Sequence, residues 1–173
     1  MISSTVGRRY FLRQERAALH EAAVVICNSQ RTATDVERFY GIDRSRLRVI
    51  YYGVEAADFR TPSEAERHAA RASLTIGERR AAVFIGALGD RRKGFDILFE
   101  TWRLLAEDPA WDVDLLVVGA GAERDAWAAR ARETGLADRI RFLGFRSDVA
   151  TVLAAADVLV HPARYEAYGL GVH

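Results

Sequence analysis

Residues 79–106 decide the fold, and they read R-R-A-A-V-F-I-G-A-L-G-D-R-R-K-G-F-D-I-L-F-E-T-W-R-L-L-A. The apolar run at 82–85 has strand length and no polar alternation, which is typical of a strand buried on both faces of a parallel sheet. A glycine-rich basic loop follows this run. Apolar residues then recur at three- and four-residue steps, at Phe95, Leu98, Phe99, Trp102 and Leu105. This spacing predicts a helix with one apolar stripe.

The same alternation extends along the chain and predicts the fold class. Ser29 and Ser147 stand where helix N-caps belong, and Gly41 and Gly135 where C-caps belong. Together these patterns predict an α/β fold with a Rossmann-like parallel sheet flanked by helices. The other expected strands are 23–27, 47–51, 113–118, 140–143 and 158–160, and the expected helices are 8–21, 30–40, 94–106, 123–134 and 149–156.

The expected organisation has two parts and a linker. Residues 56–78 interrupt the pattern, because Pro62 and its polar neighbours break the periodicity and residues 64–73 show no clear apolar face. We therefore expect a short αβαβ unit at 1–55, a linker at 56–78 and a longer Rossmann-like unit at 79–173.

Composition narrows the class of protein. Half of the 173 residues are apolar and 28% are charged, as in soluble folded domains. The 25 Lys and Arg nearly balance the 24 Asp and Glu, which argues against a protein built to bind nucleic acid or an anionic membrane. Cys27 has no partner cysteine, so we expect a reducing, cytoplasmic compartment, and four His are too few to suggest a metal cluster. No apolar run has the length of a signal peptide or a bilayer span.

Ligands bind at the carboxyl ends of the strands in sheets of this kind, so the loops that follow the strands are the candidate sites. In the loop at 86–94, Arg91, Arg92 and Lys93 place positive charge beside a helix N-terminus, a combination that suits a phosphate. The alternative is a solvated charged turn between strand and helix.

Residues 118–124, V-G-A-G-A-E-R, begin like the dinucleotide-binding fingerprint. However, Arg124 stands in place of the third glycine, and the next strand has no Asp or Glu at its end to hold a ribose. This argues against a nicotinamide-dependent oxidoreductase. The alternative is that Gly119 and Gly121 form only a tight turn.

The last loop, H-P-A-R-Y-E-A-Y-G-L-G-V-H at 161–173, carries the most specific pattern. A strand that ends V-L-V-H-P, then Glu166 and an aromatic-Gly-Leu triplet, resembles the first half of the E-x7-E motif of retaining GT-B glycosyltransferases, family 4 in particular. Glu166 corresponds to the first carboxylate of that motif. The second carboxylate is expected at position 174.

The resemblance covers almost the whole chain. Residues 22–29 (A-A-V-V-I-C-N-S) and 40–54 (Y-G-I-D-R-S-R-L-R-V-I-Y-Y-G-V) are similar to the end of the family's N-terminal domain. Residues 84–94 (F-I-G-A-L-G-D-R-R-K-G) resemble the phosphate-binding loop that opens the nucleotide-sugar-binding domain, and residues 142–148 (F-L-G-F-R-S-D) resemble its base-recognition loop.

The chain departs from the family pattern at three positions. Tyr52 and Glu55 replace the usual Asn and Asp of an N-G-V-D turn. Ala87 stands where many members have an Arg. The diphosphate would then depend on Lys93 and Arg92.

The resemblance implies a glycosyltransferase that moves a hexosyl group from a nucleotide-diphosphate sugar with retention of configuration. Arg92 and Lys93 would bind the donor phosphates from one side, and the backbone N–H groups of Gly169 and Leu170 from the other. Glu166 would orient the donor through its sugar hydroxyls. The expected catalytic residues are therefore Glu166, Lys93 and Arg92, with no metal and no cofactor.

The resemblance also assigns the nucleotide base to Phe145 and Arg146 and implies that the chain is a fragment, inactive alone, because most of the acceptor-binding domain has no counterpart before residue 1. The acceptor would be a saccharide, a lipid or a small molecule. Peripheral membrane contact would come through the missing N-terminal domain, and no nucleic-acid partner is expected. The alternative is a non-catalytic α/β nucleotide-binding or interaction module that uses the Arg-rich helix at 8–16.

Overall fold

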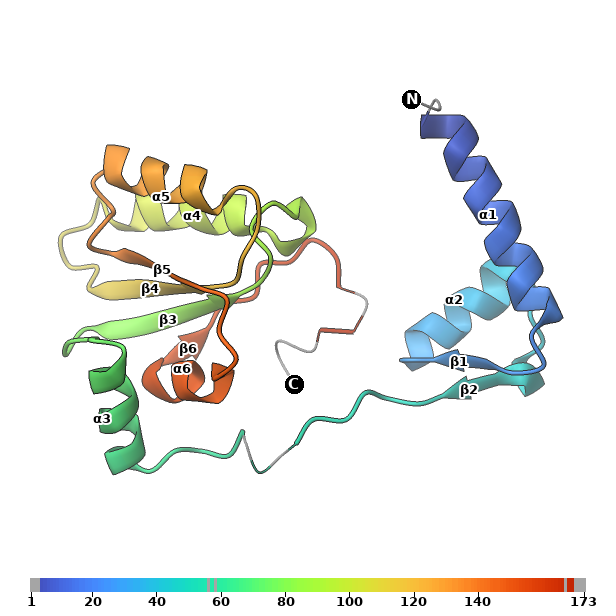
Figure 1. Cartoon of the computed structure of the whole chain (residues 1–173), viewed down its shortest axis with the longest axis horizontal. Coiled ribbons are helices and arrows are strands. Elements are labelled where there is room, and N and C mark those ends of the chain that lie inside the picture. Colours follow the sequence, from blue (N-terminus) through green and yellow to red (C-terminus); the bar gives the residue numbers. More distant parts are fainter. Residues whose placement is uncertain (1–3, 56, 58, 167, 170–173) are drawn as a thin grey trace. The chain divides into compact units, whose positions relative to one another are not determined.

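The computed structural model describes residues 4–55, 57, 59–166 and 168–169. The chain divides into two compact units, Met1–Val54 (unit 1) and Glu55–His173 (unit 2), each of which has its own core. Figure 1 labels the elements of both units.

Unit 1 is a small αβαβ layer. Strands β1 and β2 pair in parallel, with Val25 opposite Leu47. The hydroxyl of Ser29 accepts a hydrogen bond from the backbone N–H of Thr32 at 3.0 Å, and Gly41 ends the following helix in the left-handed conformation, so both predicted caps are confirmed. Its elements are α1 (Ser4–Glu21), β1 (Val25–Cys27), α2 (Gln30–Tyr40), a 3-10 turn (Arg44–Arg46) and β2 (Leu47–Val49).

Unit 2 is a four-stranded parallel sheet in the order β5-β4-β3-β6. The chain builds outward from β3 through β4 to β5 and then returns to place β6 on the other side of β3. The strand order therefore reverses between β3 and β6. The elements are α3 (Glu64–Ser73), β3 (Arg80–Ile85), a 3-10 turn (Arg91–Lys93), α4 (Phe95–Leu105), β4 (Val113–Val118), α5 (Arg124–Glu133), β5 (Ile140–Gly144), α6 (Val149–Ala155) and β6 (Val158–Leu159).

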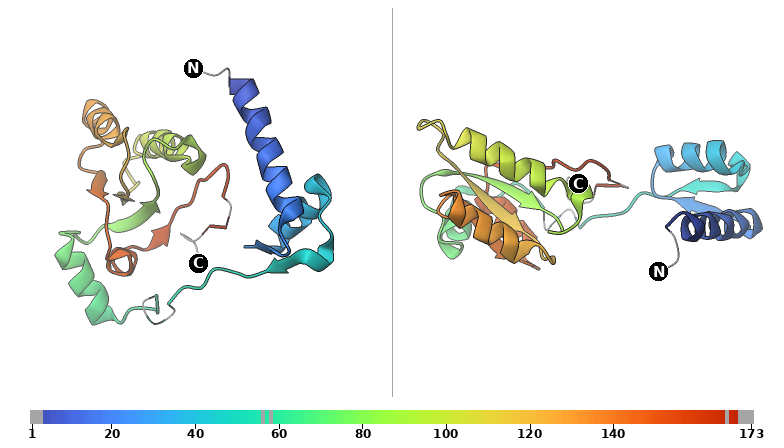
Figure 2. Two further views of the ribbon diagram at one scale, coloured as in Figure 1. Left: turned by 45° about the vertical axis from the view of Figure 1, so that its right-hand side comes forward. Right: turned by 90° about the horizontal axis from the view of Figure 1, so that it is seen from above.

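Helices cover both faces of this sheet, as the sequence predicts. On one face α4 and α5 lie over the strands, where Phe84 and Leu115 meet the buried stripe of α4. On the other face α3 and α6 lie over Val83 and Leu116. Figure 2 shows the helices on the two faces of the sheet from other directions. The Rossmann-like sheet flanked by helices is thus confirmed, and its four strands all point their carboxyl ends to one edge.

The expected linker is wrong for residues 64–73, which form helix α3 and belong to unit 2. Ser63 caps this helix, and Ala70, Leu74 and Ile76 are buried against α6 and the sheet. The sequence pattern did not reveal this apolar face. Within the helix the buried contact is made by Ala70, which gives a weak apolar signal, and the larger residues Leu74 and Ile76 come after the helix.

Two arginines of α3 fix the helix to α6. Arg71 donates to the carbonyl of Ala155 at 2.9 Å, and Arg67 donates to that of Ala156 at 2.8 Å. These bonds satisfy carbonyls that the end of α6 leaves without partners.

Most of the other predicted elements lie within a few residues of their observed bounds. Helix α2 and strand β4 match their predicted ranges, and the apolar stripe of α4 is confirmed, with four of its five residues buried. Ser147 is not the N-cap of α6, because that position belongs to Asp148, whose side chain makes no capping bond. Among the described residues, no helix combines the length and the apolar character that crossing a bilayer requires.

Candidate functional site

The loops after β3 and β4 are joined by backbone hydrogen bonds beyond the ends of the strands. The N–H of Gly86 donates to the carbonyl of Val118 at 3.0 Å, and the N–H of Leu88 donates to that of Ala120 at 2.9 Å. Gly121 has a φ of 157°, and a Cβ atom there would lie 1.5 Å from the carbonyl oxygen of Leu88. This glycine therefore allows two backbones to approach closely, which is more than a tight turn requires.

The basic stretch R-R-K forms the 3-10 turn that leads into α4. Asp90 begins this turn, and its carboxylate accepts from the backbone N–H of Arg92 at 3.0 Å and from the guanidinium of Arg92 at 2.8 Å. The Arg92 guanidinium lowers the pKa of Asp90, and the carboxylate in turn raises the pKa of Arg92. Arg91 is 81% exposed at its side chain. Thus the three cations of the turn differ in their surroundings.

The loop after β6 packs directly on this turn. Gly94 has a φ of 74°, and a Cβ atom there would lie 2.2 Å from the carbonyl oxygen of Pro162. The backbone N–H of Arg164 donates to the carbonyl of Arg92 at 2.8 Å. The two loops therefore meet at the point where the strand order reverses, which is the usual ligand position in open parallel sheets.

Lys93 and Glu166 are in contact across these two loops. Lys93 Nζ donates to Glu166 Oε1, and the two side chains are 30% and 24% exposed. His161 Nε2 lies 3.4 Å from the same carboxylate oxygen, without the geometry of a hydrogen bond. The structure thus brings together two residues that were predicted for one site and adds His161, which was not predicted from the sequence.

Arg164 and Asp96 form a second connection between the loops. The Arg164 guanidinium binds the Asp96 carboxylate through two hydrogen bonds of 2.7 and 2.8 Å. These bonds lower the pKa of Asp96 to about 2. Neither residue was predicted as part of the site, and the only sequence signal was an acidic residue in the first turn of a helix beside a basic loop.

The predicted base-binding residues lie on the loop after β5. Phe145 is 80% exposed, and the Arg146 guanidinium is bound to Asp148 by two hydrogen bonds, the longer of 2.7 Å. This pairing raises the pKa of Arg146 and lowers that of Asp148. β4 lies between β5 and β3, so this loop is about 10 Å from the loop after β3 at ~4.8 Å for each strand spacing.

The predicted phosphate contacts at the end of the chain are described only in part. Gly169 is buried with a φ of 84°, which favours glycine. Leu170 lies outside the described residues. The paired backbone N–H groups of Gly169 and Leu170 therefore stay a prediction.

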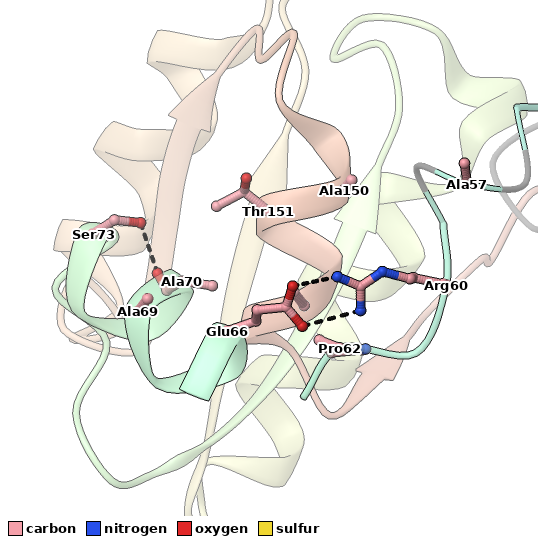
Figure 3. A pocket seen from close by; sticks show the side chains of 10 residues that line it. Ala57, Arg60, Pro62, Glu66, Ala69, Ala70, Ser73, Ala150 and Thr151 are labelled. Atoms are coloured by element: carbon pink, nitrogen blue, oxygen red, sulfur yellow. Dashed lines mark hydrogen bonds and ion pairs between the residues drawn. The ribbon is translucent and has the colours of Figure 1, made fainter. Parts of the chain in front are cut away.

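A hollow of about 440 Å³ lies elsewhere on unit 2 (Figure 3). Its described lining comes from Ala57, Arg60 and Pro62 and from helices α3 and α6, and half of it is alanine. The charged pair in it, Arg60 and Glu66, is joined by two hydrogen bonds. These two charges neutralise each other, and no predicted site residue is among the described lining. We therefore do not assign the hollow to the candidate site.

The side chains that commonly bind metal ions do not cluster in the part of the chain that the structure describes. Within the described ranges, no group of three or more His, Cys, Asp or Glu gathers that could hold a metal ion.

Comparison with known proteins agrees with this arrangement. Residues 79–173, more than half of the chain, match the family described as glycosyl transferases group 1, and residues 2–58 match Glycosyltransferase Family 4. The D-inositol 3-phosphate glycosyltransferase of Mycobacterium sp. (strain KMS) is 34% identical over 164 residues, which cover 90% of this chain and 35% of the relative. That of Rhodococcus opacus (strain B4) is 29% identical, with 90% and 36% covered. The chain spans about a third of the length of these relatives.

Solved structures show the same fold. The crystal structure of Anabaena Alr3699/HepE in complex with UDP matches with a TM-score of 0.69 and 27% identity over 84% of this chain and 40% of HepE. WaaG, a glycosyltransferase involved in lipopolysaccharide biosynthesis, matches with a TM-score of 0.73 and 26% identity over 85% and 40%. The chain therefore belongs to the glycosyl transferases group 1 and has the Rossmann-like α/β fold of the GT-B glycosyltransferases.

Proposed function

We propose that unit 2 binds a nucleotide-diphosphate sugar and that a longer enzyme containing this chain transfers a hexosyl group from it with retention of configuration. The contact between Lys93 and Glu166 carries this proposal. It joins a cation suited to a phosphate and a carboxylate suited to sugar hydroxyls, at the reversal of the strand order. The HepE structure with UDP supports a donor of the same class.

The leaving group determines what the site has to do. As the glycosidic bond breaks, negative charge grows on the β-phosphate and positive charge grows on the sugar. Lys93 and Arg92 stabilise the phosphate from one side, and the N–H groups of Gly169 and Leu170 stabilise it from the other. Glu166 accepts hydrogen bonds from the sugar hydroxyls and orients the donor. Because these groups supply the positive field, the proposed reaction uses no metal and no cofactor.

Lys93 and Glu166 have to exchange partners when the donor binds. Before binding, each satisfies the charge of the other. The ammonium then turns to the diphosphate, and the freed carboxylate turns to the sugar. The loops that hold them are tied together by backbone and side-chain bonds, so the exchange needs the rotation of two side chains.

The base lies towards the loop after β5 in this proposal. Phe145 offers an exposed ring on which a base can stack, and Arg146 supplies hydrogen-bond donors. An extended nucleoside diphosphate would cross the edge of β4 to reach from this loop to Lys93.

The acceptor side of the reaction belongs to the longer enzyme. We propose a saccharide, lipid or small-molecule acceptor, bound with the help of a complete N-terminal domain that also makes any peripheral membrane contact. The enzyme would work in the cytoplasm. Residues 1–173 alone would transfer no sugar, and a product detected by mass spectrometry from the purified 173-residue chain would contradict this.

Nuclear magnetic resonance titration of the 173-residue chain tests donor binding. UDP is expected to shift the amide resonances of residues 86–94 and 161–166. Lys93→Ala should weaken UDP binding about tenfold or more, as the loss of a charge-assisted hydrogen bond does, and leave uridine binding unchanged. Arg91→Ala is the matched control, because its side chain is far more exposed and donates to Asp96 rather than to Glu166, while Asp96 keeps its two hydrogen bonds from Arg164. Wild-type affinity for UDP in Lys93→Ala would overturn the proposed phosphate site.

A further inference from the structure

Arg164 connects the two loops that carry Lys93 and Glu166. Its guanidinium donates to the carbonyl of Arg91 at 2.6 Å and to both carboxylate oxygens of Asp96. Its backbone N–H donates to the carbonyl of Arg92. One residue thus makes four hydrogen bonds to a segment 68 to 73 positions earlier in the chain.

Asp96 is well placed to receive this side chain. It lies in the first turn of α4, where the helix dipole favours a negative charge, and its side chain is only 24% exposed. The planar guanidinium matches the carboxylate through two parallel hydrogen bonds, which a lysine cannot reproduce. Because α4 is anchored in the core by Phe95 and Leu98, Asp96 is a fixed point on the rigid part of unit 2.

We propose that Arg164, bound to Asp96, is a positioning residue that holds the loop after β6 against the loop after β3 and so sets Glu166 opposite Lys93. This proposal rests on the proposed function, because the pair so placed is the one assigned to the donor. Arg164 itself touches neither phosphate nor sugar. We call the pair the Arg164–Asp96 clamp.

The clamp matters because Lys93 has a long and flexible side chain. Its ammonium contributes fully to binding only if the backbone that carries it stays in place, and a displacement of about 1 Å can cost a hundredfold in rate. Without the clamp, the ties that the described residues still provide between the two loops include the backbone bond at Arg164, the packing of Gly94 on Pro162 and the Lys93–Glu166 contact itself, which breaks when the donor binds.

Hydrogen exchange of the 173-residue chain tests the clamp without any ligand. In Arg164→Ala, the backbone N–H of residue 164 should exchange roughly tenfold faster, and protection in the core strands β3 and β4 should not change. Arg103→Ala is the matched control, because Arg103 pairs with Glu100 of α4 and with Glu107 just after α4, outside both loops, and is similarly exposed. Unchanged exchange at residue 164 in Arg164→Ala would overturn the clamp.

UDP affinity in a double-mutant cycle separates positioning from a general structural role. Arg164→Ala should bind UDP about tenfold more weakly, within the range that coupled neighbours show, and should bind uridine like the wild type. The variant with both Arg164→Ala and Lys93→Ala should bind UDP no more weakly than Lys93→Ala alone. Losses that multiply, or an equal loss for uridine, would show that Arg164 does not act through Lys93.

The two proposals fail in different ways. A wild-type chain that binds no UDP would overturn the proposed function and the donor role of the clamp, while hydrogen exchange would still decide whether the clamp orders the loops. A wild-type chain that binds UDP, beside an Arg164→Ala variant that binds it equally well, would overturn the clamp alone.

Discussion

The loops after β3 and β6 differ from the loop after β5 in how they hold their charges, although all three end at the same edge of one sheet. Lys93 and Glu166 are 73 positions apart in the chain, and Arg164 and Asp96 are 68 apart. Arg146 pairs with Asp148 only two positions away, as Arg92 pairs with Asp90 in the loop after β3, but among the described ion pairs Arg146 has no long-range partner, and it lies beside the exposed Phe145. Long-range pairs fix one loop relative to another, whereas a local pair fixes only its own turn.

Under the proposed function, this difference fits the different tasks of the two regions. Loops that are fixed relative to each other during folding need no reorganisation of the backbone when the reaction occurs, so after the exchange of partners by Lys93 and Glu166 they suit the phosphate and the bond that breaks. A loop that keeps an exposed ring and a local ion pair suits a part of the ligand that only has to be recognised. The chain thus combines a preorganised end and an adaptable end on one sheet.

Lys93→Ala should produce the largest effect, and it tests the preorganised end of the site. In the extended enzyme, turnover should fall by about 100-fold or more, and donor binding should fall less, because the charge that Lys93 faces grows as the bond breaks. Arg92→Ala should act in the same direction but less, since Asp90 already holds its guanidinium. Steady-state kinetics measures both variants.

Arg91→Ala is the control for these kinetics. Its turnover should change little, because Arg91 is part of an exposed ion pair. Circular dichroism checks the folding of each variant. Turnover near that of the wild type in Lys93→Ala would mean that R-R-K is only a charged turn.

Gly94→Ala tests the close approach of the two loops. Gly94 and Gly135 have φ values of 74° and 72°, but a Cβ atom at Gly135 would meet nothing within 4 Å. Gly135→Ala should therefore cost about 1–2 kcal/mol for the left-handed conformation alone. Gly94→Ala should cost more, because its Cβ atom would push Pro162 away. Chemical denaturation compares the free energies of unfolding, and equal losses would contradict the close packing of the loops.

Phe145→Ala should have a smaller effect, confined to the adaptable end. Loss of a stacked ring should weaken UDP binding by about two- to tenfold. Pyrophosphate, which has no base, should bind the variant and the wild type equally. An equal loss for both probes would mean that this loop contacts the phosphates, and the comparison between the two ends would fail.

The smallest effect concerns the response of the clamp to acid. Hydrogen bonds from Arg164 lower the pKa of Asp96 from 3.8 to about 2 in the folded chain. The stability that this carboxylate adds is therefore present above about pH 4 and is lost as the pH falls towards 2. Asp96→Asn should be less stable than the wild type at pH 5, and the difference should narrow by pH 2. A difference that stays constant over this range, measured by denaturation at each pH, would contradict the linkage.

Patterns that depend on neighbouring residues were predictable from the sequence. The apolar stripe of α4, the caps Ser29 and Gly41, and strand β4 follow from local periodicity and cap chemistry. Helix α3 was not predictable in this way, because Ala70 is its one buried residue and alanine gives a weak apolar signal.

The candidate site likewise has a part that local motifs predict and a part that depends on the fold. Lys93 and Glu166 could be named from loop motifs at the ends of β3 and β6. The pairing of Arg164 with Asp96 could not, because it depends on the order of the strands and on the direction in which α4 leaves its loop. A guanidinium near a carboxylate becomes visible only when the fold brings the two loops together.

A crystal structure of the 173-residue chain with UDP would test the central claim most directly. We expect the β-phosphate within hydrogen-bond distance of Lys93 Nζ, a broken Lys93–Glu166 contact, and Arg164 still bound to Asp96. UDP bound with its diphosphate away from Lys93, for example beside Arg60 in the hollow between α3 and α6, would contradict it.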